Sequence, residues 1–261
     1  MTNLIKYLLC CLLLIEGLSA SVLASEEHIY RVGIEDIEYY PMFTTKEERN
    51  KTGFLIGVME LFAKQRGVKF EYIHLPITRF EEWYRQESID FRLPDNPIWN
   101  TNNDKLVFSA DILQLPSHTV VLKKNQSTPV SNLKFLGSLH GFMPAFHWEE
   151  RIKSGKTQFT FKSSIRVLIQ MLVKGMVDGL DVNISVVHHY AKELGYNTDD
   201  FVESTEAPIF QYTYALSTMS HPEIIKDFDA FLVASQNEIN LLKQRKNIVE
   251  VKQSDSSGND N

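Results

Sequence analysis

The stretch YRVGIEDIEYYPMF, residues 30–43, begins as a β-strand and then stops reading as one. Its last residues bring together acids, two tyrosines, a proline and a phenylalanine. In parallel α/β sheets, ligands bind at the carboxyl ends of the strands. We therefore expect the turn over residues 35–43 to present acidic and aromatic side chains to a binding site.

Beyond this stretch, short β-rich runs alternate with helical patterns, which predicts βαβ units and a largely parallel sheet. GFLIGVMELFAKQRG (residues 53–67) repeats its apolar residues at helical spacing and ends in a glycine. Thr78 and Glu81 are spaced as a capping box, which predicts a helix to about residue 88. A strand is expected to end at Pro94, followed by a polar loop.

A second βα series follows along the rest of the chain. Strands are expected over residues 133–139, 176–182 and 211–219, and helices over residues 163–175 and 185–194. Ser220, Pro222 and Glu223 predict an N-cap, a first-turn proline and a capping-box acid for a last helix.

The N-terminal residues 1–24 have the pattern of a secretory signal peptide. Lys6 precedes an apolar run over residues 7–15, and small residues follow near Ala24. The run is shorter than the roughly 20 residues that span a bilayer. Both cysteines, Cys10 and Cys11, lie inside it, so the mature chain is expected to have no thiol for disulfides, metal binding or nucleophilic catalysis.

Composition narrows the classes of function further. The formal net charge is −6 and the basic residues are scattered, which argues against nucleic-acid binding. The mature length suffices to bury a core, so no cofactor is expected to be needed for folding. The polar, small residues 253–261 predict a disordered tail.

The order of these pieces resembles the family 3 extracellular solute-binding proteins, the two-lobed periplasmic receptors of amino-acid ABC transporters. The resemblance covers nearly the whole mature chain through seven segments in order. These are residues 30–43 and 52–73, the Asp-containing strand and loop over 88–97, the Phe-Ser approach to the hinge over 108–113, and residues 130–141, 174–183 and 210–225.

The resemblance implies an α/β fold of the type II periplasmic-binding-protein kind. Each lobe would be a mostly parallel sheet flanked by helices, and two hinge strands would join the lobes. Lobe 1 would comprise residues 25–113 and 211–252, and lobe 2 residues 114–210. It further implies a periplasmic monomer without a cofactor, which closes on a small molecule and presents it to a membrane permease.

The resemblance also implies which residues contact the ligand. Asp36 and Tyr39 match ligand-contacting positions best, and Tyr40 and Phe43 belong to the same turn. The alternative for these rings is that they only cover the edge of the lobe. Pro41 is expected to be structural.

Three departures from the family pattern concern the groups that hold an α-amino acid. Residues 100–105 contain no arginine for the ligand carboxylate, Asn183 replaces the acid that holds the ammonium, and Phe142 replaces a hydroxyl residue. Asp181 lies nearby on the same predicted strand. Unmatched charges in a buried site cost several kcal/mol. We therefore expect a ligand other than a standard free α-amino acid.

Other side chains are candidates to replace this anchor. They are Arg79, Arg92, Asp95 and, as a ring for stacking on a flat or cationic ligand, Trp99. The alternatives are a solvated Arg79 at the surface, an Arg92 paired with an acid, and a Trp99 in edge packing.

Three other functions compete with solute uptake: metal binding, catalysis and ligand sensing. His188 and His189 are adjacent, and residues 147–150 show no metal-ligand spacing, so no metal site is expected. The sequence has no Gly-x-Ser-x-Gly and no phosphate loop, and the mature chain is expected to have no thiol, so an enzyme is not expected, although Glu35 or Asp36 has the chemistry of a general acid. A soluble sensing subunit for a membrane receptor stays an alternative to transport.

Overall fold

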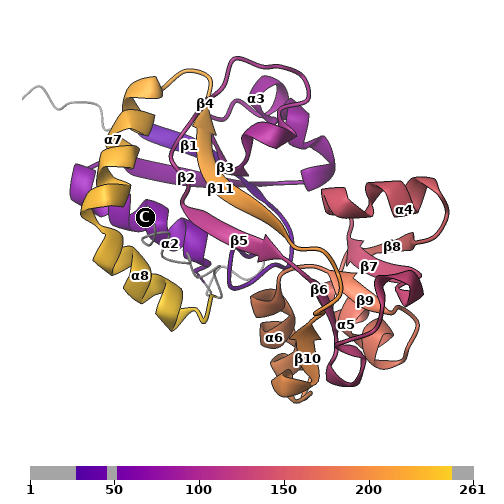
Figure 1. Cartoon of the computed structure of the whole chain (residues 1–261). Coiled ribbons are helices and arrows are strands. Elements are labelled where there is room, and N and C mark those ends of the chain that lie inside the picture. Colours follow the sequence, from indigo (N-terminus) through magenta and orange to yellow (C-terminus); the bar gives the residue numbers. More distant parts are fainter. Residues whose placement is uncertain (1–27, 46–51, 249–261) are drawn as a thin grey trace, which may run out of the picture.

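The computed structural model describes residues 28–45 and 52–248, and the chain folds into two lobes (Figure 1). The predicted signal peptide and C-terminal tail lie outside the described residues. Within the described part, no helix has the length and apolarity needed to cross a membrane.

Lobe 1 is built on a six-stranded sheet in the order β2-β1-β3-β11-β4, with β5 also pairing with β11. Its strands are β1 (Ile29–Glu35), β2 (Lys69–Leu75), β3 (Phe91–Asp95), β4 (Val107–Phe108), β5 (Leu113–Ser117) and β11 (Phe210–Thr218). Its helices are α2 (Phe54–Arg66), η3 (Ile77–Glu82), α3 (Trp83–Gln86), η4 (Pro97–Trp99), α7 (Pro222–Ala234) and α8 (Gln236–Arg245).

Lobe 2 is built on a five-stranded sheet in the order β10-β6-β9-β7-β8. Its strands are β6 (Thr119–Leu122), β7 (Phe135–Leu139), β8 (Gln158–Lys162), β9 (Gly179–Asp181) and β10 (Phe201–Glu203). The α-helices are α4 (Glu149–Lys153), α5 (Ile165–Val173) and α6 (Ile184–Glu193). Short 3-10 turns are η5 (Lys123–Asn125), η6 (Val130–Asn132), η7 (Phe146–Trp148) and η8 (Thr198–Asp200).

Two strands carry the chain between the lobes. β5 leads out of lobe 1 and β11 returns to it, and the two pair antiparallel from Leu113↔Tyr214 to Ser117↔Phe210. Figure 1 shows both strands running toward the junction of the lobes. β1, β2 and β3 are parallel, as the βαβ pattern predicted, and the returning strand runs antiparallel to β3 and β4, so the sheet is mixed.

The predicted helices over α2, α5, α6 and α7 are confirmed, but two predicted caps are wrong. Residues 77–86 form a 3-10 turn and a four-residue helix, because the backbone of Arg79 (φ −117°, ψ 21°) breaks the helical path, and Thr78 makes no cap. At α7 the N-cap is His221 rather than Ser220. Thr218 Oγ1 accepts from the N–H groups of Ser220 and His221 instead.

The lobes are in close contact. The largest cluster of buried apolar side chains is continuous from Val32 and Phe43 in lobe 1 to Leu139 and Ile165 in lobe 2. At Gly141, which has φ +90°, a Cβ would collide with the side chain of Ile77 across the junction. The structure is therefore a closed arrangement of the lobes, and side chains from both meet at their junction.

Candidate ligand site between the lobes

Glu35 ends β1 at the lobe junction and is almost fully buried, with 3% of its surface exposed. Its Oε2 atom has no hydrogen-bond partner among the described residues. Burial, and then the nearby charge of Asp95, raise the pKa of Glu35 to about 8. At neutral pH this side chain is therefore mostly a protonated carboxyl group, which can both donate and accept a hydrogen bond.

Three tyrosines form a cluster near Glu35, of which Tyr39 and Tyr214 are buried and Tyr212 is partly buried. Tyr212 and Tyr214 lie two residues apart on β11, so they extend from the same face, and their ring centroids are 5.4 Å apart. Hydrogen bonds link the hydroxyl of Tyr212 to those of Tyr39 and Tyr214. Burial raises the pKa of all three phenols, so they remain neutral hydrogen-bonding groups.

Rings from both lobes cover this cluster. Tyr39 stacks on Phe43 at 5.2 Å between centroids and meets Phe142 of lobe 2 edge-on at 5.1 Å. The ring centroid of Trp99 lies 6.1 Å from that of Tyr214 and 5.8 Å from that of Phe80. The hydroxyl groups are thus enclosed by aromatic walls, which is the usual construction of a small-molecule site.

Lobe 2 contributes the start of α6. Asn183 caps this helix by accepting from Ser185 N–H at 2.9 Å, and its own N–H donates to the hydroxyl oxygen of Tyr39 at 3.1 Å. Its Nδ2 group is buried and has no partner within the described part of the chain. Asp181, two residues earlier, accepts from Ala145 N–H at 2.8 Å, which ties the loop after β7 to β9.

A second set of contacts between the lobes lies near the surface. Glu38 pairs with Arg166 and accepts from Ser164 Oγ at 3.0 Å. Arg166 also pairs with Glu193 at 2.6 Å and lies over the ring of Tyr190 at 4.5 Å. The turn over residues 35–43, whose Tyr39 bonds to Asn183, is therefore also held to lobe 2 by the ion pair of Glu38.

Arg92 and Asp95, both predicted as ligand contacts, bind each other. The Nε and Nη2 atoms of Arg92 each lie 2.7 Å from Asp95 Oδ2, and both side chains are buried. Asp95 also accepts from Ser217 Oγ and from Asn96 N–H. Arg92 thus pairs with an acid, the alternative considered from the sequence, and neither residue presents a free charge to a ligand.

The other residues predicted to bind ligand differ in their exposure to solvent and in their partners. Arg79 is 54% exposed and pairs with Glu87 at 3.6 Å, as the alternative of a surface arginine expects. Asp36 is half-buried and lies 3.9 Å from His74. Tyr40 packs against His189 of lobe 2 and against Lys246. For all of the predicted residues, a role in ligand binding stays a prediction.

The sequence interpretation predicted Tyr39, Phe43, Phe142, Asp181 and Asn183 as site residues, and these lie at the junction, but it missed Tyr212 and Tyr214. The period-two spacing of the tyrosines in QYTYALST was the signal that they share one face of a strand. Glu35 belongs to the turn whose acids were expected to face the ligand, but Asp36 was preferred, because the sequence does not show which of the two acids points inward.

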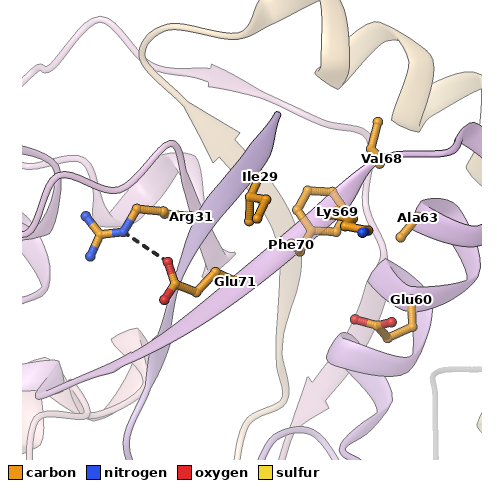
Figure 2. A pocket seen from close by; sticks show the side chains of 8 residues that line it. All are labelled: Ile29, Arg31, Glu60, Ala63, Val68, Lys69, Phe70 and Glu71. Carbon is orange, nitrogen blue, oxygen red and sulfur yellow. Dashed lines mark ion pairs between the residues drawn. The ribbon is translucent and has the colours of Figure 1, made fainter. Parts of the chain in front are cut away.

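A separate hollow of about 560 Å³ lies at the outer edge of lobe 1, between β1, β2 and α2 (Figure 2). Arg31 and Glu71 form an ion pair across it at 3.4 Å, and both side chains are well exposed. The hollow is open to solvent and its facing charges are already paired, which makes the lobe junction the stronger candidate for a binding site.

Comparison with solved structures supports the fold. An ABC uptake transporter substrate-binding protein from Streptococcus pneumoniae with bound histidine matches with a TM-score of 0.69 and 14% identity, covering 87% of this chain and 95% of that chain. The chain has the two-lobed type II periplasmic-binding-protein fold. No protein-family model and no curated protein sequence matches it.

Two reconstructed ancestral proteins have the same fold. An ancestral arginine-binding protein bound to arginine matches with a TM-score of 0.65 and 20% identity, covering 84% of this chain and 97% of that chain. An ancestral amino-acid-binding protein, a precursor of cyclohexadienyl dehydratase, matches with a TM-score of 0.62 and 18% identity, covering 84% and 95%.

Proposed function

We propose that this chain is an exported solute-binding protein that captures a small polar or ring-bearing metabolite between its lobes. In this proposal residues 1–24 direct export to the periplasm and are removed. Lobe 1 comprises residues 25–113 and 211–252, and lobe 2 residues 114–210. A monomer then presents the closed, ligand-bound form to an ABC permease. The fold and the printed roles of the similar structures support this proposal.

One observation carries the proposal. Among the residues that the structure describes, Glu35 Oε2 in lobe 1 and Asn183 Nδ2 in lobe 2 are both buried without a hydrogen-bond partner. Tyr39 accepts from Asn183 N–H, and its hydroxyl is close enough to Glu35 for the two groups to interact electrostatically. Buried polar atoms without partners are costly and rare in native proteins. A ligand that offers a hydrogen-bond donor to Glu35 and an acceptor to Asn183 satisfies both atoms at once.

The charges at the junction argue against a free α-amino acid. Arg92 is bound to Asp95, and Arg166 is bound to Glu38 and Glu193, so both guanidinium groups are already neutralised. A zwitterion closed into this region would bury a carboxylate without a cationic partner, at a cost of several kcal/mol. We therefore propose a neutral or singly cationic ligand, with a ring that packs against Trp99 and Phe142.

A thermal-shift screen tests the proposal on a chain that starts at Ser25. One arm contains the twenty standard amino acids, and the other contains purine and pyrimidine bases, nicotinamide and aromatic amines. A member of the second arm at about 100 times its dissociation constant stabilises the fold by roughly 2.7 kcal/mol. Glu35→Gln and Asn183→Ala should each reduce that shift, whereas the control Lys153→Ala, at an exposed position of lobe 2 away from the junction, should keep it.

Catalysis on the same scaffold is the second candidate. Glu35, with its pKa raised to about 8, has the property required of a general acid at neutral pH. One similar structure is also described as a precursor of a dehydratase. Incubating each stabilising compound with the protein and following it by NMR separates the two candidates: an unchanged spectrum supports binding, and turnover lost in Glu35→Gln supports an enzyme.

A further inference from the structure

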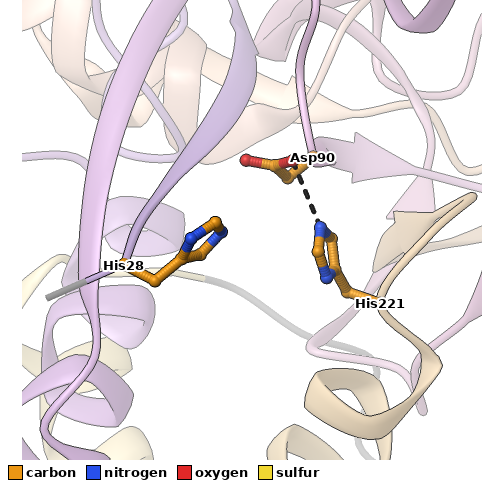
Figure 3. A group of neighbouring side chains, drawn as sticks. All are labelled: His28, Asp90 and His221. Carbon is orange, nitrogen blue, oxygen red and sulfur yellow. Dashed lines mark hydrogen bonds and ion pairs between the residues drawn. The ribbon is translucent and has the colours of Figure 1, made fainter. Parts of the chain in front are cut away.

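Two histidines and an aspartate from three separate segments point toward one another in lobe 1 (Figure 3). His28 directly precedes β1, Asp90 directly precedes β3, and His221 caps α7. One ligand-type atom from each lies within 4.8 Å of the others. The cluster lies at the start of β1, whereas Glu35 ends the strand, so the two sites are about 20 Å apart.

The surroundings of His221 carry the argument. Its Nε2 atom lies 3.2 Å from Asp90 Oδ1, and its Nδ1 atom lies 3.4 Å from Glu223 Oε1. A neutral imidazole has one N–H group and one lone pair. If Nδ1–H faces Glu223, the lone pair of Nε2 faces the carboxylate of Asp90, and a cation between these two atoms replaces their repulsion with two favourable contacts.

The cluster is also held in place by its neighbours. Asp90 Oδ2 accepts from Arg31 N–H at 2.7 Å, and the Asp90 carbonyl accepts from Thr218 Oγ1 at 2.7 Å. The ring of Tyr30 packs edge-on against His28 at 4.4 Å and against His221 at 5.1 Å. Asp90 and His221 are thus fixed before any ion binds, and the exposed His28 is free to adjust.

We propose that His28, Asp90 and His221 bind a divalent transition-metal ion of the zinc class. Zinc takes imidazole nitrogen and carboxylate oxygen at about 2.0–2.2 Å, and three protein ligands leave a fourth position for water or a further group. Glu223 is then the outer carboxylate that fixes the orientation of the His221 ring, a common partner of metal-binding histidines. The ion ties the starts of β1, β3 and α7 together.

No metal signal was visible in the sequence at this place, because the three residues are far apart along the chain and share no short spacing. The pair His188 and His189, which drew attention in the sequence, belongs to lobe 2 and lies on α6. The proposed ion site does not depend on the ligand proposal, since it uses none of the residues at the lobe junction.

Isothermal titration of tag-free, chelator-treated protein with ZnCl₂ tests the inference on a chain that starts at Ser25. The expected result is one zinc ion per chain. His28→Ala and His221→Ala should each weaken binding at least about tenfold, and Glu223→Gln should weaken it by about tenfold through the orientation of the ring. His140→Ala, which removes an exposed histidine of lobe 2, should bind zinc as the unmodified chain does.

Cobalt substitution provides an independent readout. Visible absorption of a four-coordinate Co²⁺ ion should appear in the unmodified chain and disappear in His28→Ala, whose exposed side chain can be removed without emptying the core. The inference is overturned if no zinc binds, or if His28→Ala and His221→Ala bind zinc unchanged.

Discussion

The hydroxyl oxygen of Tyr39 accepts a hydrogen bond from the backbone N–H of Asn183 at 3.1 Å, joining a turn of lobe 1 to the start of a helix of lobe 2. Tyr39 is 1% exposed and Asn183 is 2% exposed, so both ends of this bond are shielded from water. The closed arrangement of the lobes therefore depends on a buried polar contact as well as on apolar packing.

Tyr39→Phe should destabilise the closed form, because it leaves the N–H group of Asn183 buried without an acceptor. The expected loss is about 1–3 kcal/mol in the free energy of unfolding, measured by urea denaturation. Tyr72→Phe is the matched control, since it removes a hydrogen bond to Glu60 within lobe 1. Equal losses in both variants would contradict a special role for the contact between the lobes.

The ion pair between Glu38 and Arg166 should contribute less to the free energy of unfolding than the contact between Tyr39 and Asn183 does. Both side chains are about a third exposed, so a double-mutant cycle with Glu38→Gln and Arg166→Gln should give a coupling energy of about 0.5–1 kcal/mol. Roughly 1 M salt should remove most of it. A coupling that persists undiminished in high salt would show that the pair is not a solvent-screened contact.

Stability should fall as the pH rises because of Glu35. The pKa of this group is about 8 in the folded chain against an ordinary value of 4.5, so the folded state binds its proton more tightly than the unfolded state does. The contribution is complete below pH 4.5 and is lost as the pH rises through 8. The contribution of Glu35 to the free energy of unfolding has an upper limit of about 5 kcal/mol.

Glu35→Gln should flatten this part of the pH dependence. Urea denaturation at several pH values between 5 and 8 measures the free energy of unfolding of the unmodified chain and of the variant. The difference between the two values isolates Glu35, because the other titrating groups contribute equally to both. Asp95, Tyr39 and Tyr214 face Glu35 and are present in both. Parallel curves for the two proteins would show that the carboxyl group is not protonated in the folded state.

Arg92→Met should be strongly destabilising, because it leaves Asp95 buried without its cationic partner. Loss of one member of a buried ion pair costs about 3–5 kcal/mol. The double variant Arg92→Met with Asp95→Asn should recover part of this loss, and Arg79→Ala at the surface should change stability by less than about 0.5 kcal/mol. No recovery in the double variant would argue against the pairing as the cause.

Much of the fold was predictable because it follows from local patterns. The apolar spacing of residues 54–66 and 165–173 and the glycines after the helices specify α2 and α5 without tertiary information. The caps at Thr78 and Ser220 were predicted wrongly. The first turn begins after Pro76 without a side-chain cap, and before α7 the hydroxyl that accepts backbone N–H groups is that of Thr218. Local spacing alone did not show where these helical turns begin.

The site was less predictable because its geometry is set across the chain. Tyr39 and Asn183 are far apart in sequence and meet only when the lobes close. Strand alternation alone would place Arg92 and Asp95, three residues apart on β3, on opposite faces, so the sequence presented them as separate ligand anchors, yet the two buried side chains pair with each other. Sequence alone gives residue types at a strand end, but not which of them bind each other.

The central claim, that two lobes open and close around a site at Tyr39 and Asn183, is tested most directly by a distance between the lobes. A chain starting at Ser25 has no cysteine, so Met176→Cys in lobe 2 and Val233→Cys on α7, both exposed, accept a pair of spin labels. We predict a short distance population that shifts toward a longer one when Tyr39→Phe and Glu38→Gln are added. A single distance that both substitutions leave unchanged would contradict the account.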